Sequence, residues 1–153
     1  MRRLLSLSQH AVRYLLGAVM TFAGLAHLTV ARAEFQAQVP SWIPVDPDLV
    51  VVGSGVVEVL LGLALLLLGR WRLWAGVALA VFYVLIFPGN VAQYVEGRDG
   101  FGLDTDRARL VRLFFQPVLV LLALWAAGLP RMHRAPAAPR NGVTGARTAR
   151  RAR

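Results

Sequence analysis

Four long apolar runs dominate the hydrophobic pattern of this chain. A helix needs about 20 apolar residues to cross the hydrocarbon core of a bilayer, which is about 30 Å thick. The pattern predicts spans at residues 10–30, 48–69, 72–95 and 107–129. The link between the second and third spans is only two residues long on these boundaries, so those two spans should be antiparallel neighbours. We therefore predict an all-α fold, a bundle of four transmembrane helices.

Composition agrees with a multi-pass protein of the cell membrane. The chain is 57% hydrophobic and only 16% charged, whereas a soluble domain carries about 25% charged residues. It has no cysteine, which excludes disulfides, thiol redox motifs and cysteine-ligated metal within the chain. The net charge of +9 could suggest a nucleic-acid partner, but seven of the 17 Arg lie in residues 131–153. We expect residues 130–153 to be a disordered basic tail attracted to anionic lipid, with no nucleic-acid partner.

The distribution of charge predicts the orientation. The residues before the first span, the short link with Arg72 beside it, and the residues after the last span carry eleven Arg and no acid. The two longer loops, with Asp48 at the end of the first, carry seven of the eight acids. Because cytoplasmic loops carry the Arg excess, both termini and the short link should be cytoplasmic and the two acidic loops external. Arg107, Arg109 and Arg112 break this rule at the external start of the fourth span, which makes them candidates for a role.

An alternative interpretation concerns the N-terminus. Arg2 and Arg3, the apolar stretch that follows and the small residues around Ala33 resemble a signal peptide with its cleavage site. The apolar stretch is longer than the usual 7–15 residues, and His27 is close to the proposed cut. We therefore expect the first span to be retained.

Glu58 is the most informative residue in the sequence. It is the only carboxylate in the apolar run of residues 49–69, and a charge near the bilayer centre costs about 2.5–3.5 kcal/mol even on lenient scales. Such a residue normally faces a partner inside the bundle. On the expected boundaries Arg112 lies roughly 7 Å closer to the external surface than Glu58, a distance that an Arg side chain can bridge. We therefore predict a buried Glu58–Arg112 ion pair.

Small and polar residues recur at seven-residue spacing on two spans. The second span carries Gly55, Gly62 and Gly69, and the third carries Gly76, Tyr83 and Asn90. Small residues at this spacing allow helices to approach closely. Both stripes should therefore face neighbouring helices and not lipid.

Helical facing and depth bring further polar residues toward Glu58. The predicted ligand-binding or polar core consists of His27, Ser54, Glu58, Asn90, Arg109, Arg112 and Gln116. Structural roles are the alternatives: Glu58 in an ion pair that only fixes packing, His27 as a hydrogen-bonded interior residue, and Asn90 satisfying backbone groups near Pro88. A lone intramembrane His cannot supply both axial ligands of a haem. We predict no catalytic residue and no metal site.

Four sequence blocks resemble the DoxX family of small bacterial membrane proteins. They are AGLAH at residues 23–27, VPSWIP at 39–44, SGVVE at 54–58 and FPGN at 87–90. The resemblance implies four helices with cytoplasmic termini, and it supports His27, Glu58 and Asn90 as a shared polar core. The family usually has Ala where this chain has Gly89, which should loosen the helix at that point.

The resemblance also implies a function. Members of that family have been linked to quinol oxidase and thiosulfate oxidation systems and to oxidative-stress assemblies. The chain is therefore expected to be an accessory subunit of a membrane redox or quinone-linked assembly, with a redox protein partner and a polar cavity in the outer half of the bundle. A quinone is the candidate ligand. The chain has no intrinsic cofactor motif, so it should not move electrons alone, and we lean against its being an enzyme.

Two other functions remain open from the sequence. One is a non-enzymatic membrane chaperone or scaffold, in which the polar core only fixes the bundle. The other is a carrier of protons or small molecules, for which four helices are few, so it would require a homo-oligomer.

The expected orientation can be tested with reporter fusions. Fusions after residues 40 and 100 should report an external location, and a fusion after residue 140 an internal one, because the Arg excess lies on that side. An internal signal at residue 100 would refute the four-span arrangement. A mature N-terminus at Glu34 would instead support the signal-peptide interpretation.

Overall fold

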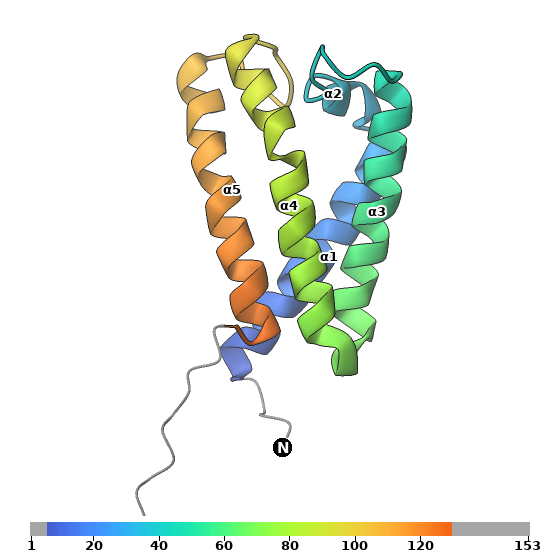
Figure 1. The fold of residues 1–153 in the computed structure, drawn as a ribbon, viewed down its shortest axis with the longest axis vertical. Helices are drawn as coiled ribbons and strands as arrows, with labels where there is room; N and C mark the ends of the chain where they lie inside the picture. The colour runs from blue at the N-terminus through green and yellow to red at the C-terminus, as the bar shows by residue number, and fades with distance from the viewer. Residues whose placement is uncertain (1–5, 130–153) are drawn as a thin grey trace, which may run out of the picture.

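The computed structural model describes residues 6–129, and this part of the chain is helical with no strand (Figure 1). The helices are α1 (Leu7–Leu28), α2 (Arg32–Gln36), α3 (Pro47–Leu67), the 3-10 helix η1 (Gly69–Trp71), α4 (Arg72–Val95) and α5 (Asp106–Ala127). The four long helices coincide with the expected spans to within three residues at each end, and each is long and apolar enough to cross a membrane. The sequence pattern did not predict α2 or η1. The expected basic tail lies outside the described residues.

Side-chain caps explain where three of the long helices begin. Ser6 caps α1 and forms a capping box with Gln9. The Asp46 side chain accepts a hydrogen bond from the amide of Asp48 at the start of α3, and Thr105 accepts one from Ala108 at the start of α5. Such caps satisfy amides that have no partner within the helix.

The helices α1 and α3 pack with their backbones in contact at glycines. A Cβ atom at Gly24 would lie 2.6 Å from the carbonyl oxygen of Gly55, and one at Gly17 would lie 3.0 Å from that of Gly62. The expectation that Gly55 and Gly62 face a neighbouring helix is confirmed, and that helix is α1. Gly69, the third residue of the expected stripe, lies in η1 beyond the end of α3.

The helices α4 and α5 form a second close pair. The expected stripe of Gly76, Tyr83 and Asn90 is buried, and a Cβ at Gly76 would lie 2.9 Å from the carbonyl oxygen of Ala123. The helix α4 continues through Pro88. A Cβ at Gly89 would lie 2.5 Å from the carbonyl oxygen of Gln38, so the glycine allows the loop after α2 to approach α4.

The two pairs separate toward one end of the bundle. Contacts are dense within the pairs α1–α3 and α4–α5 and sparse between them. Figure 1 shows the pairs close together near η1 and wider apart near α2. We call these the η1 end and the α2 end. The α2 end also carries the loop between α4 and α5, so both acidic loops lie together, opposite Arg70 and Arg72.

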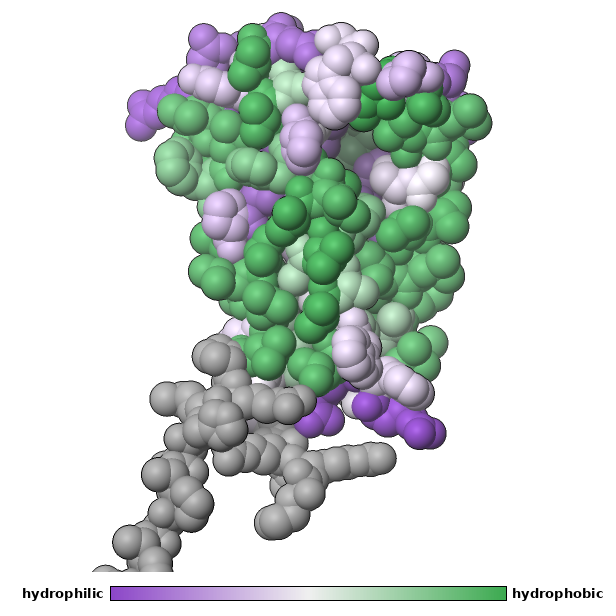
Figure 2. Space-filling view, in the orientation of Figure 1, coloured by the Kyte–Doolittle hydropathy of each residue, from purple (hydrophilic) through white to green (hydrophobic). Residues whose placement is uncertain are grey.

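The outer surface of the bundle suits a lipid environment. Figure 2 shows a broad apolar band between polar ends. Large apolar side chains are exposed on all four long helices, among them Phe22, Leu60, Leu85, Phe114 and Leu121. Water would penalise so much exposed apolar surface, whereas hydrocarbon does not.

The close contact between α1 and α3 predicts the effect of one methyl group. Gly24→Ala should destabilise the protein by about 1–3 kcal/mol, because the new Cβ would overlap the backbone of Gly55. Gly53→Ala on α3 is the matched control: no atom lies within 4 Å of its Cβ position, so stability should be unchanged or slightly higher. Thermal unfolding in mild detergent measures both. Equal melting temperatures for the two variants would contradict the backbone contact.

Candidate functional site

The centre of the site is a buried pair formed by His27 and Glu58. His27 lies at the end of α1 and Glu58 in the middle of α3, and both side chains are 7% exposed. The His27 Nδ1 atom is 2.9 Å from Glu58 Oε2 and 2.9 Å from the carbonyl oxygen of Ala23. A ring nitrogen carries one hydrogen at most. The geometry of a hydrogen bond is met between Nδ1 and the Ala23 carbonyl, and not between Nδ1 and Glu58 Oε2. Oε2 is buried and has no hydrogen bond within residues 6–129, so it remains an available acceptor.

The predicted Glu58–Arg112 ion pair is wrong. Glu58 contacts His27, and the Arg112 guanidinium lies half-buried over the ring of Phe101, 5.4 Å from its centroid. The physical reason is lateral position. A Cβ at Gly55, one turn before Glu58, would lie 2.7 Å from His27 Cβ, so the glycine contact brings α1 against this face of α3. The depth of a residue along its own helix does not show which other helix packs against the face that carries it.

Two further members of the predicted core lie elsewhere. Arg109 is buried at the α2 end, where it forms ion pairs with Asp99 and Asp106 and donates a 3.2 Å hydrogen bond to the carbonyl of Arg98. It therefore fixes the loop before α5 and is not brought to Glu58. Ser54 donates to a carbonyl of its own helix, at Val51, over 3.0 Å.

Asn90 and Gln116 do come together, between α4 and α5. Asn90 Nδ2 donates a 3.0 Å hydrogen bond to Gln116 Oε1. Gln116 Nε2 donates a 2.6 Å bond to the carbonyl of Tyr83, about one turn before Pro88. All three side chains are buried, so this network joins the two helices near the proline.

Tyr83 connects this network to the other helix pair. Its hydroxyl donates a 3.2 Å hydrogen bond to the sulfur of Met20 on α1. Tyr83 therefore makes polar contacts with both α1 and α5.

A row of aromatic rings lies between Glu58 and Arg112 at the α2 end. His27 stacks on Phe35 of α2, with 3.2 Å between centroids, and Phe35 meets Phe101 edge to face at 4.5 Å. We call His27, Phe35 and Phe101 the aromatic row. It connects α1, α2 and the loop before α5, so Glu58 and Arg112 lie at its two ends. Phe35 and Phe101 are not among the predicted core residues, since a single phenylalanine in a short connection between spans gives no periodic signal.

Polar contacts hold the loops that carry this row. Glu34 Oε2 accepts a 2.6 Å hydrogen bond from the amide of Phe101, whose φ of 57° is in the left-handed region. That conformation is strained for a residue with a side chain. Near it, hydrogen bonds from Arg98 and then Ser41 hold the pKa of Glu96 below its ordinary value of 4.5. The two acidic loops are therefore tied to each other.

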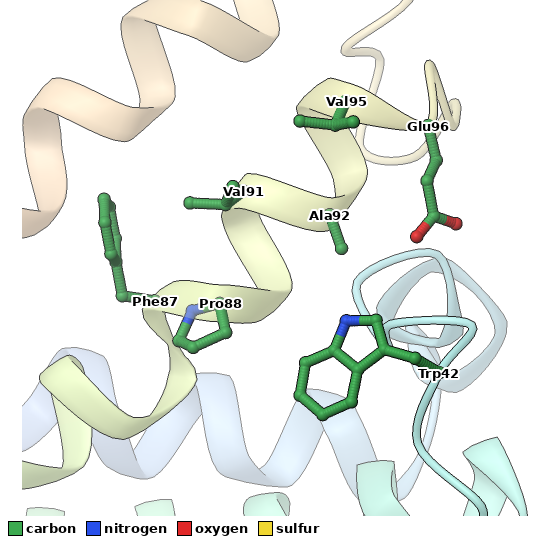
Figure 3. A pocket seen from close by; sticks show the side chains of 7 residues that line it. All are labelled: Trp42, Phe87, Pro88, Val91, Ala92, Val95 and Glu96. Carbon is green, nitrogen blue, oxygen red and sulfur yellow. The ribbon is translucent and has the colours of Figure 1, made fainter.

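A groove of about 440 Å³ runs along the half of α4 nearer the α2 end. Figure 3 shows Trp42 of the loop after α2 facing Pro88 and Ala92 across it, with Glu96 at its rim. In the space-filling view the surface is hollowed near this loop (Figure 2). The groove is apolar apart from Glu96, and it opens on the side of the bundle.

Two glutamines with a buried polar atom were not predicted: Gln38 is half-buried and Gln93 is buried. Gln38 Nε2 and Gln93 Oε1 have no hydrogen bond in the described part of the chain. Gln93 is on α4 three residues after Asn90, and its position in the polar stripe could have identified it. Between residues 6 and 129 no three His, Asp or Glu side chains are grouped as a metal site.

Comparison with known proteins gives one match. A family model described as Domain of unknown function (DUF8561) matches residues 16–127. The chain belongs to this family. The DUF8561 match begins within α1 and ends at the last residue of α5, so it covers the bundle and the whole candidate site. The searches of curated proteins and of solved structures gave no match.

The His27–Glu58 contact predicts which substitutions destabilise the bundle. Glu58→Ala should cost about 3–5 kcal/mol, because it breaks a buried pair, and Glu58→Gln should cost less because the amide keeps a polar contact. Arg112→Met should cost less than about 1 kcal/mol, since its described contact is one cation–π interaction. Thermal unfolding in detergent compares them. Equal losses of stability for Glu58→Ala and Arg112→Met would instead support the predicted ion pair between Glu58 and Arg112.

Proposed function

We propose that this protein is an accessory subunit of a membrane redox or quinone-linked assembly, and that it binds a quinone head group between its two helix pairs. The binding region would lie below the aromatic row, next to Glu58. The resemblance to the DoxX family, the external location of the α2 end and a redox protein partner are parts of the same proposal.

One observation carries the proposal: the Glu58 carboxylate is 5% exposed and its Oε2 atom has no hydrogen bond within the described range. A buried acceptor of this kind is costly when unsatisfied. Intramembrane carboxylates are rare, and they usually mark pathways or sites. A ligand hydroxyl that donates to Oε2 would remove this cost.

The carboxylate suits the reduced form of a quinone. A hydroxyl of that form needs an acceptor, which Glu58 Oε2 provides. The quinone would supply the redox chemistry. The side chains bind and orient the head group, and the His27–Glu58 pair can hold a proton beside it.

The groove along α4 supports access from the bilayer. It is lined by Trp42, Phe87, Pro88 and Val91, among others, and opens toward the side of the bundle. An apolar tail can lie along such a surface while the head group lies deeper. This arrangement suits a lipid-soluble ligand better than a water-soluble one.

A scaffold or chaperone function is the second candidate. The hydrogen bonds among Asn90, Gln116 and the Tyr83 carbonyl satisfy one another, as expected of a network that only fixes packing. In that case Glu58 and His27 would serve the same purpose on the other helix pair.

Bound quinone distinguishes these functions. The protein is purified from its own membranes in mild detergent, and extracted quinones are quantified by mass spectrometry. The double variant His27→Leu, Glu58→Met should fold, because both buried polar groups are removed together. We expect it to retain about tenfold less quinone per protein, since one charged hydrogen bond contributes that much affinity.

Ser54→Ala is the matched control on α3. Its hydroxyl bonds its own helix, so quinone content should not change. If the double variant folds, retains its quinone and fully complements a null strain, the polar core is structural and the scaffold function replaces the redox one.

A further inference from the structure

Arg13 is a buried cation at the end of the molecule opposite the candidate site. It lies in the second turn of α1 and is 3% exposed. Its Nε and Nη1 atoms are buried and have no hydrogen bond within residues 6–129. The contact described for its guanidinium is the ring of Tyr14, 4.4 Å from the centroid. A buried guanidinium with two unpaired nitrogens is strongly destabilising, so an anion should neutralise it.

No acidic side chain of this chain can be that anion. The chain has eight Asp and Glu residues. Seven are in the two acidic loops or at the adjoining helix starts, at the α2 end. The eighth, Glu58, contacts His27, which is fourteen residues further along α1 and therefore about 21 Å from Arg13. The sequence outside residues 6–129 contains Arg but neither Asp nor Glu.

The surroundings of Arg13 suit a phosphate group. A Cβ at Gly69 would lie 3.7 Å from Arg13 Nη1, so the glycine is a close neighbour of this nitrogen and places no side chain over it. Arg70 and Arg72 follow Gly69 in the turn and add positive charge at the same end. Guanidinium donors match phosphate oxygens in geometry, and the bonds are charge-assisted.

The depth of Arg13 corresponds to the level of lipid head groups. Trp71 and Trp74 are exposed at the η1 end, and exposed tryptophans are typical of the interface between membrane and water. A phosphate at this level belongs to the lipids of that leaflet.

We propose that Arg13, beside Gly69, forms a binding site for the phosphate of an anionic phospholipid at the η1 end. The site is separate from the proposed quinone site and does not depend on it. The lipid phosphate accepts hydrogen bonds from the Arg13 guanidinium, and Gly69 places no side chain between them.

The test uses the full chain in mild detergent with phosphatidylglycerol, phosphatidylcholine or inorganic phosphate added. Native mass spectrometry measures lipid affinity, and thermal unfolding measures stabilisation. Phosphatidylglycerol should bind and raise the melting temperature, and the other two should have little effect. Arg13→Met should weaken phosphatidylglycerol binding about tenfold, as expected for the loss of charged hydrogen bonds.

Two further variants make the test specific. Gly69→Ala keeps every charge but fills the space beside Nη1, so it should also weaken phosphatidylglycerol binding while the protein still folds, because 3.7 Å is an ordinary contact. Arg70→Gln is the matched control. It removes one exposed positive charge at the same end, and it should change the affinity less than twofold.

Stability without anionic lipid gives an independent readout. In phosphatidylcholine alone, Arg13→Met should be at least as stable as the natural protein, because it removes a buried charge. A loss of stability there would show that Arg13 has its partner inside the protein and would overturn the proposal. Equal weakening by Arg13→Met and Arg70→Gln would overturn it too, and so would an equal effect of inorganic phosphate.

Discussion

The close approach of α1 to α3 is the contact on which the rest of the structure depends. Glycines on both helices allow their backbones to touch, with the Gly24 position only 2.6 Å from the Gly55 carbonyl oxygen. This distance brings His27 against the face of α3 that carries Glu58. It also sets the start of α2, and therefore the place where Phe35 can stack on His27. The backbone contact between α1 and α3 thus determines that His27 lies against Glu58 and that Phe35 stacks on His27.

Charge is sorted along the axis of the bundle. The acids lie at the α2 end, the arginines of the short turn lie at the η1 end, and Glu58 is the one acid between them. Arg98 and Arg109 neutralise acids at the α2 end, where both loops are tied down. At the opposite end Arg13 has no acid within reach in this chain. The asymmetry that predicts the orientation therefore also separates Arg13 from the acids of this chain.

The sequence predicted those features that depend on one helix at a time. Apolar runs set the four spans, and a lone carboxylate in such a run had to be buried, as Glu58 is. Asn90 and Gln116 were placed in the polar core because each lies on a polar stripe, and they form a hydrogen bond. The partner of Glu58 was wrong because depth along a helix does not decide which helix is nearest. The aromatic row could not be predicted, since it depends on a five-residue helix and on the left-handed backbone of Phe101.

The aromatic row has a mechanical consequence. Phe35 belongs to α2, which follows α1, and Phe101 to the loop that precedes α5, so the contact between these rings joins the two helix pairs where the pairs are furthest apart. If the pairs moved apart, this contact would break together with the hydrogen bond between Glu34 and the Phe101 amide, and Phe35 would lose its support over His27. Widening of the bundle and hydration of the Glu58 carboxylate would then be the same event, so entry of a ligand would be coupled to exchange of a proton with water.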